Sequence, residues 1–137
     1  MDGISAAKWC VDHNMIQQSY TILQETLISH FLIMVNEDPK AYTNRTVASQ
    51  SVAIFNRKLS EKYWKQPAAN NKKLVEKLIR LFTATPKLAE EMRNLTTYRN
   101  DLNHAGYVQS PMPPIKFKKT MLVMLDRLIG MLGKVTG

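Results

Sequence analysis

The sequence is short of cysteine: Cys10 is the only one among its 137 residues. A single cysteine forms no disulfide within the chain, and it excludes a metal site built from several cysteine ligands. Because Cys10 lies among apolar positions near the start of the chain, we expect its thiol to be packed and unreactive.

Long apolar runs are also lacking. No stretch approaches the ~20 consecutive apolar residues that cross a bilayer. Residues 1–15 lack the basic start and apolar run of a signal peptide. We therefore expect a cytoplasmic protein without a membrane partner.

Acidic residues are few. The chain has 11 aspartates and glutamates against 19 lysines and arginines, which gives a net charge of +8. This charge favours a polyanionic partner, and RNA, DNA and an anionic membrane surface all qualify. The contents of 45% hydrophobic and 22% charged residues are those of a globular chain. We expect a single domain over residues 1–137.

The spacing of apolar residues predicts five helices and no strand. In the first helix, apolar side chains recur every three, four or seven residues, which is the stripe of an amphipathic helix. The polar segment 36–39 ends in a proline and terminates it. Short connections favour an antiparallel all-α bundle, in which Met121, Met124 and Met131 fill the core or a helix interface. The predicted helices cover about residues 5–35, 43–64, 72–82, 86–106 and 115–132.

Most catalytic motifs are missing. The sequence has no glycine-rich phosphate loop, no paired metal-binding histidines and no nucleophile elbow, and we expect neither a metal nor another cofactor. Of the three histidines, His13 and His30 lie near the apolar stripe of the first predicted helix and are expected to be structural. His104 differs, because polar side chains surround it in residues 98–107 at the end of a helix.

Arg99 precedes His104 by five residues in this polar segment. On a regular helix the two positions lie roughly 140° apart around the axis, so they do not share a face. They meet within one chain if the helix end unwinds, or across the two-fold axis of a homodimer, which is the commonest oligomer. Asn100 lies four residues before His104, and Asn103 lies four residues after Arg99, so each is a neighbour on the helix surface.

The pattern Arg99-Asn100-x-x-x-His104 resembles the signature of the HEPN superfamily (higher eukaryotes and prokaryotes nucleotide-binding domains). The wider chain is similar to the C-terminal effector domain of CRISPR-associated ancillary ribonucleases. This likeness extends over residues 9–10, 17–25 and 104–106.

The resemblance implies an all-α HEPN-like domain that acts on single-stranded RNA as a homodimer. In that family an N-terminal CARF sensor domain binds cyclic oligoadenylate and activates the ribonuclease, as part of type III CRISPR antiviral defence. No such sensor precedes the first predicted helix, so we place no cyclic oligoadenylate site in this chain.

The expected chemistry uses the 2′-hydroxyl of RNA as its nucleophile and therefore needs no metal. Arg99 suits the phosphate, because a guanidinium is planar and always charged. His104 suits proton transfer, because the ordinary pKa of histidine is close to neutrality. We expect Asn100 to orient His104 or the phosphate, with Asn103 and Tyr107 in supporting positions. The expected product ends in a 2′,3′-cyclic phosphate.

Basic residues concentrate in the middle of the sequence. They form either solvated helix faces or a track for an RNA backbone. The candidates that we single out for RNA binding are Lys72, Lys73, Lys77 and Arg80. The wider set adds Arg57, Lys58, Lys62, Lys65 and Lys87, with Lys116, Lys118 and Lys119 later in the chain.

Three other functions stay open. A non-catalytic basic helical subunit of a CRISPR complex, which binds RNA or dimerises, needs neither Arg99 nor His104. A HEPN toxin is the second, although toxin families favour an aromatic residue two places after the histidine, where this chain has Gly106. The third is a silent HEPN domain that only dimerises. For the motif itself, the non-catalytic interpretation is an ion pair of Arg99 with Asp101 at a helix end.

Overall fold

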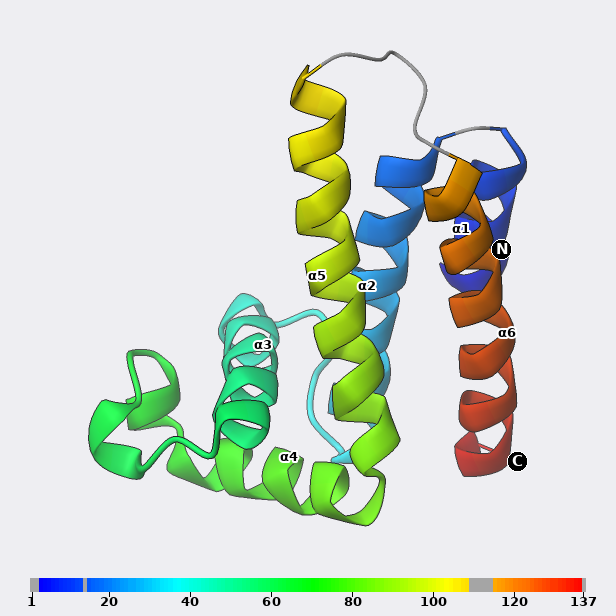
Figure 1. Ribbon diagram of the computed structural model, residues 1–137. Coiled ribbons are helices and arrows are strands. Elements are labelled where there is room, and N and C mark those ends of the chain that lie inside the picture. Colours follow the sequence, from blue (N-terminus) through cyan, green and yellow to red (C-terminus); the bar gives the residue numbers. More distant parts are fainter. Residues whose placement is uncertain (1–2, 14, 109–114, 137) are drawn as a thin grey trace. The chain divides into compact units, whose positions relative to one another are not determined.

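The structure is a computed structural model that describes residues 3–13, 15–108 and 115–136, with side chains described for 3–13, 15–100 and 118–131. Within these residues there are six α-helices, two short 3₁₀-helices and no strand (Figure 1). The predicted all-α class is therefore confirmed. In chain order the elements are α1 (Gly3–Asp12), α2 (Ile16–Met34), α3 (Tyr42–Arg57), η1 (Glu61–Tyr63), η2 (Ala68–Asn70), α4 (Lys72–Ala84), α5 (Pro86–Val108) and α6 (Ile115–Thr136).

The chain forms two compact units. Unit 1 contains residues 1–26 and 94–137, and unit 2 contains residues 27–93. Helices α2 and α5 each contribute one part to unit 1 and the other part to unit 2. Unit 2 has twelve basic and six acidic residues, so it carries +6 of the net charge of +8.

The predicted first helix is in fact two helices, α1 and α2, because the backbone leaves the helical path between them. Nδ1 of His13 lies 2.7 Å from the carbonyl oxygen of Trp9, which also accepts the His13 N–H at 3.1 Å. The Met15 N–H then bonds to the carbonyl of Cys10, five residues back, at 2.7 Å. Such a wide turn closes many helix ends. Apolar spacing misses the break, because buried positions continue on both sides of it.

The predicted second helix, over residues 43–64, is also too long: α3 ends at Arg57. Lys58 adopts the left-handed backbone conformation, with φ of 54°, and its N–H bonds back to the carbonyls of the last turn of α3. A left-handed residue is a common helix terminator, but it is usually glycine, so a lysine gives no signal in the sequence. The predicted end at residues 36–39 is confirmed, since α2 ends at Met34.

Unit 1 has its core between α1, α6 and the first part of α2. Met121 and Met124 of α6 are fully buried, as predicted, whereas Met131 is only partly buried. Helix α1 packs against α6 and buries Ala7 and the thiol of Cys10. The Ser19 hydroxyl of α2 donates a buried hydrogen bond of 2.8 Å to the carbonyl of Ala7, so α1 and α2 are joined as well.

Unit 2 packs α3 against α4 around aromatic rings. The ring of Phe82 meets Phe31 edge-on at 5.1 Å and Phe55 at 5.7 Å between centroids. Nη1 of Arg45 donates to the carbonyl of Pro39 at 2.7 Å and holds the chain between α2 and α3. Helix α4 is amphipathic as predicted, and its buried residues are Leu74, Val75, Leu78 and Phe82.

Candidate functional site

Arg99 lies on α5 in unit 1, where its side chain is half-buried. Its Nη1 donates a hydrogen bond of 2.8 Å to Oε1 of Gln24 on α2. Its Nε is shielded from solvent and has no hydrogen-bond partner. An arginine carries five N–H groups, so most donors of this guanidinium remain available. A buried N–H without a partner is rare in proteins, so this guanidinium is incompletely satisfied by the described residues.

Gln24 orients this guanidinium. Its Nε2 donates to Oγ1 of Thr96 at 3.4 Å, so the amide nitrogen points to Thr96 and the amide oxygen points to Arg99. Thr96 and Arg99 are three residues apart on α5 and therefore share a face of that helix. No local sequence pattern predicts this role of Gln24, because Gln24 and Arg99 are 75 positions apart in the chain.

The positive charge of Arg99 is not neutralised by any carboxylate whose side chain is described. Its partner Gln24 is neutral. The side chain of Asp101 lies outside the described residues, so the ion pair of Arg99 with Asp101 stays a prediction. Among the described side chains no carboxylate pairs with Arg99, so its positive charge can attract an anionic ligand.

The region beside this contact is poor in water. Tyr20 is fully buried on α2, one helical turn before Gln24. Burial raises the pKa of the Tyr20 phenol, and the neighbouring Tyr98 raises that pKa further. The phenol therefore stays protonated at neutral pH. Because a low dielectric strengthens Coulomb attraction, a phosphate held by Arg99 at the edge of this region would be bound more tightly than in bulk water.

The other residues of the predicted motif lie on the same helix. Asn100 is exposed. Asn103, His104 and Tyr107 lie in the last turns of α5, and their side chains are outside the described residues. The predicted contacts of these three side chains therefore stay predictions.

Helix α5 continues from Arg99 past His104 to Val108, two residues beyond the predicted end at Gly106. In a continuous helix the backbone positions of Arg99 and His104 lie about 140° apart around the axis. The helix does not unwind between Arg99 and His104, so the two residues do not meet within one chain in the way that an unwound helix end would allow. The other predicted arrangement, in which Arg99 and His104 meet across the two-fold axis of a homodimer, stays a prediction.

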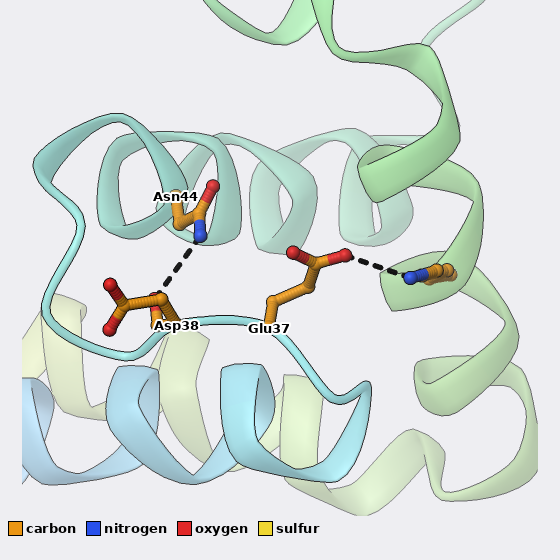
Figure 2. Close-up of polar contacts among 4 residues, drawn as sticks. Glu37, Asp38 and Asn44 are labelled. Atoms are coloured by element: carbon orange, nitrogen blue, oxygen red, sulfur yellow. Dashed lines mark hydrogen bonds and ion pairs between the residues drawn. The ribbon is translucent and has the colours of Figure 1, made fainter.

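Two of the four lysine and arginine candidates on α4 are in ion pairs. Nζ of Lys72 lies 3.3 Å from a carboxylate oxygen of Glu61. Nζ of Lys77 lies 2.8 Å from Oε1 of Glu37 (Figure 2). A phosphate that binds either lysine must compete with the carboxylate, so these two are poor sites for an RNA backbone.

Lys73 and Arg80 differ from them. Both side chains are exposed, and they lie seven residues apart, on one face of α4. In the described part of the chain neither is in an ion pair. The polar face of α4 therefore offers two of its four candidate cations to a ligand. These residues belong to unit 2, whereas Arg99 belongs to unit 1.

Two further features of the described residues concern metals and membranes. No three histidine, cysteine, aspartate or glutamate side chains are grouped there as ligands for a metal ion. No helix in that part of the chain has both the length and the apolar character to cross a bilayer. Comparisons with protein-family models, with curated proteins and with solved structures find no match to this chain. The likeness to the HEPN superfamily therefore rests on the sequence motif.

Proposed function

We propose that this chain is a metal-independent endoribonuclease of the HEPN type that cuts single-stranded RNA. Arg99 binds the scissile phosphate, His104 transfers a proton, and Asn100 orients one of the two. The observation that carries the proposal is the state of Arg99, which is half-buried, held by a neutral amide and not neutralised by any described carboxylate. A cation held in place beforehand stabilises a phosphate without having to reorganise first.

The reaction begins at the 2′-hydroxyl of RNA. As this oxygen bonds to phosphorus, its proton passes to a base, and the bond from phosphorus to O5′ breaks as O5′ takes up a proton. The products are a 2′,3′-cyclic phosphate and a 5′-hydroxyl. A histidine serves in either proton transfer, and the guanidinium stabilises the charge that builds on the phosphate oxygens.

The active form that we propose is a homodimer. Because α5 is continuous, one chain keeps Arg99 and His104 about 140° apart on its backbone. A two-fold axis beside this part of α5 would bring the residues of two chains into one cleft, where each chain supplies an equivalent pair. By its resemblance, the role of such a dimer would be that of an effector in type III CRISPR antiviral defence.

The test is cleavage of a fluorescent single-stranded RNA in EDTA. Removal of a general acid or base slows a reaction by about 10²–10⁴-fold, and we expect a loss in this range for His104→Ala. Arg99→Ala is expected to lose activity as well. The matched control is Arg93→Ala, which removes an exposed arginine from the same helix and should cut at the wild-type rate. Cleavage that EDTA abolishes, or His104→Ala that cuts as fast as wild type, would contradict the proposal.

A second candidate is a non-catalytic RNA-binding subunit. It is favoured by the charge of unit 2, which carries +6, and by the exposed ring of Tyr63 in that unit. A subunit of this kind needs a basic surface but does not need Arg99 and His104. It predicts that the wild-type protein binds the fluorescent RNA and leaves it intact.

A further inference from the structure

The connection between α3 and α4 in unit 2, drawn in green in Figure 1, carries exposed cations before and after an exposed aromatic residue in the chain. Tyr63 has 62% of its surface exposed. Three basic residues of the connection, Lys58, Lys62 and Lys65, are exposed too, as is Arg57 at the end of α3. We name the five residues the Tyr63 platform: Arg57, Lys58, Lys62, Tyr63 and Lys65.

The charges of the Tyr63 platform are not paired with carboxylates in the described part of the chain. The acidic residue of the connection, Glu61, lies 3.3 Å from Lys72, which is outside the platform. Nζ of Lys62 lies 5.0 Å from the centroid of the Tyr63 ring, within the range of a cation–π contact. A flat ligand that stacks on this ring would therefore find a positive charge beside it.

Hydrogen bonds from neighbouring residues fix the backbone of the connection. Nε1 of Trp64 donates to the carbonyl of Leu59 at 3.2 Å. Gln50 of α3 bonds in both directions: its Nε2 donates to the carbonyl of Gln66 at 3.1 Å, and its Oε1 accepts the Ala68 N–H at 3.0 Å. A loop that is ordered before binding loses little conformational entropy when a ligand arrives.

We propose that the Tyr63 platform binds single-stranded RNA, with the ring of Tyr63 stacked on a base and the four cations on nearby phosphates. A single strand matches this combination, because each base offers a face for stacking and each linkage carries a negative charge. A double helix hides its base faces. An anionic membrane favours surfaces with several apolar side chains that insert, whereas Tyr63 is the only exposed apolar or aromatic residue of segment 57–66. The proposed function supplies RNA as the ligand class, but binding here requires no cleavage.

The Tyr63 platform replaces the face of α4 as the place where we expect most RNA contacts. On α4, Lys72 and Lys77 are bound to carboxylates, and no exposed aromatic residue lies among them. On the platform all four cations are exposed and a ring lies between them in the sequence. Of the basic residues found in the sequence, we therefore expect those of the Tyr63 platform to bind RNA, whereas Lys72 and Lys77 form ion pairs with carboxylates.

The test is fluorescence anisotropy with a labelled 2′-O-methyl oligouridine of about 12 nucleotides, which falls within the site sizes of single-strand binders. The methyl group blocks the nucleophile, so binding is measured without cleavage. Stacking on an aromatic ring contributes about 1–3 kcal/mol per base, so Tyr63→Ala should weaken binding by about 5- to 150-fold. Tyr63→Phe keeps the ring and should bind within about twofold of wild type.

The salt dependence tests the cations. Lys62→Ala combined with Lys65→Ala should reduce the slope of log K against log salt by about 1.4, which is 0.7 for each lost phosphate contact. The matched control combines Lys8→Ala with Lys40→Ala, which removes two exposed lysines elsewhere and should leave the slope unchanged.

The inference would be wrong if Tyr63→Ala bound the oligouridine as well as wild type does. It would also be wrong if the salt slope changed only when Lys73 and Arg80 were replaced, or if the protein bound phosphatidylserine vesicles but not the oligouridine. If no RNA is cut but Tyr63→Ala still weakens binding, the proposed ribonuclease is rejected and the platform stands. If RNA is cut and Tyr63→Ala has no effect, the platform alone is rejected.

Discussion

Replacement of Gln24 by leucine removes the only described acceptor of the Arg99 guanidinium. A hydrogen bond to a charged group contributes about 1.5–3 kcal/mol to stability. Because Arg99 is half-buried and its freed Nη1 reaches water in part, we expect Gln24→Leu to lower the free energy of unfolding by about 1–2 kcal/mol. For a chain of this size that corresponds to a decrease in melting temperature of about 3–8 °C.

The same substitution should also reduce cleavage. Without the amide oxygen of Gln24, nothing described in the structure keeps the guanidinium in its present orientation. A displacement of about 1 Å at a reacting group can cost a factor of about 10² in rate. We therefore expect kcat to fall about 10- to 100-fold in the fluorescent RNA assay.

Gln24→Glu separates the positioning role from a merely structural one. The carboxylate keeps an acceptor at the same place, and the new ion pair should leave the melting temperature equal to or above that of wild type. Cleavage should still fall, because a phosphate must now compete with a carboxylate for the guanidinium. Gln24→Leu thus lowers both stability and activity, whereas Gln24→Glu lowers activity alone. Gln24→Glu that cuts at the wild-type rate would refute the reasoning.

Phe82→Ala should lower the free energy of unfolding by about 3–5 kcal/mol in chemical denaturation, because the ring is fully buried and meets two other phenylalanines; a loss below 1 kcal/mol would contradict this packing. A double-mutant cycle over Glu37 and Lys77 should yield a coupling of about 0.2–1 kcal/mol that decreases as salt is added, since both side chains are partly exposed. Tyr20→Phe should flatten the alkaline stability profile. Burial raises the pKa of the phenol in the folded state, so wild type loses stability as the pH rises above about 10 and the variant loses less; parallel profiles would show that the phenol is not buried.

Sequence patterns predicted the parts of the fold that depend on burial. The helices that correspond to α4 and α6 were predicted, and so was the burial of Met121 and Met124, because a helix that buries one face must repeat apolar residues along it. Helix ends were less predictable. The break after α1 depends on backbone hydrogen bonds to Trp9 and Cys10, and the end of α3 depends on a left-handed lysine. Neither feature changes the apolar period.

The candidate site was predictable only in part. The motif on α5 could be read from the sequence because Arg99, Asn100 and His104 are close together in the chain. The contact of Arg99 with Gln24 spans 75 residues, and that of Lys77 with Glu37 spans 40, so they form only when helices pack. Composition likewise shows that the chain is basic, but only the ion pairs in the structure distinguish occupied lysines from those of the Tyr63 platform.

The central claim is that the 2′-hydroxyl of RNA, assisted by Arg99 and His104, is the nucleophile. Mass spectrometry of the fragments that the wild-type chain makes from single-stranded RNA in EDTA tests it most directly. The account predicts fragments that end in a 2′,3′-cyclic phosphate and begin with a 5′-hydroxyl, and none from His104→Ala. Fragments with a 3′-hydroxyl and a 5′-phosphate would contradict it, because they require water or another external nucleophile.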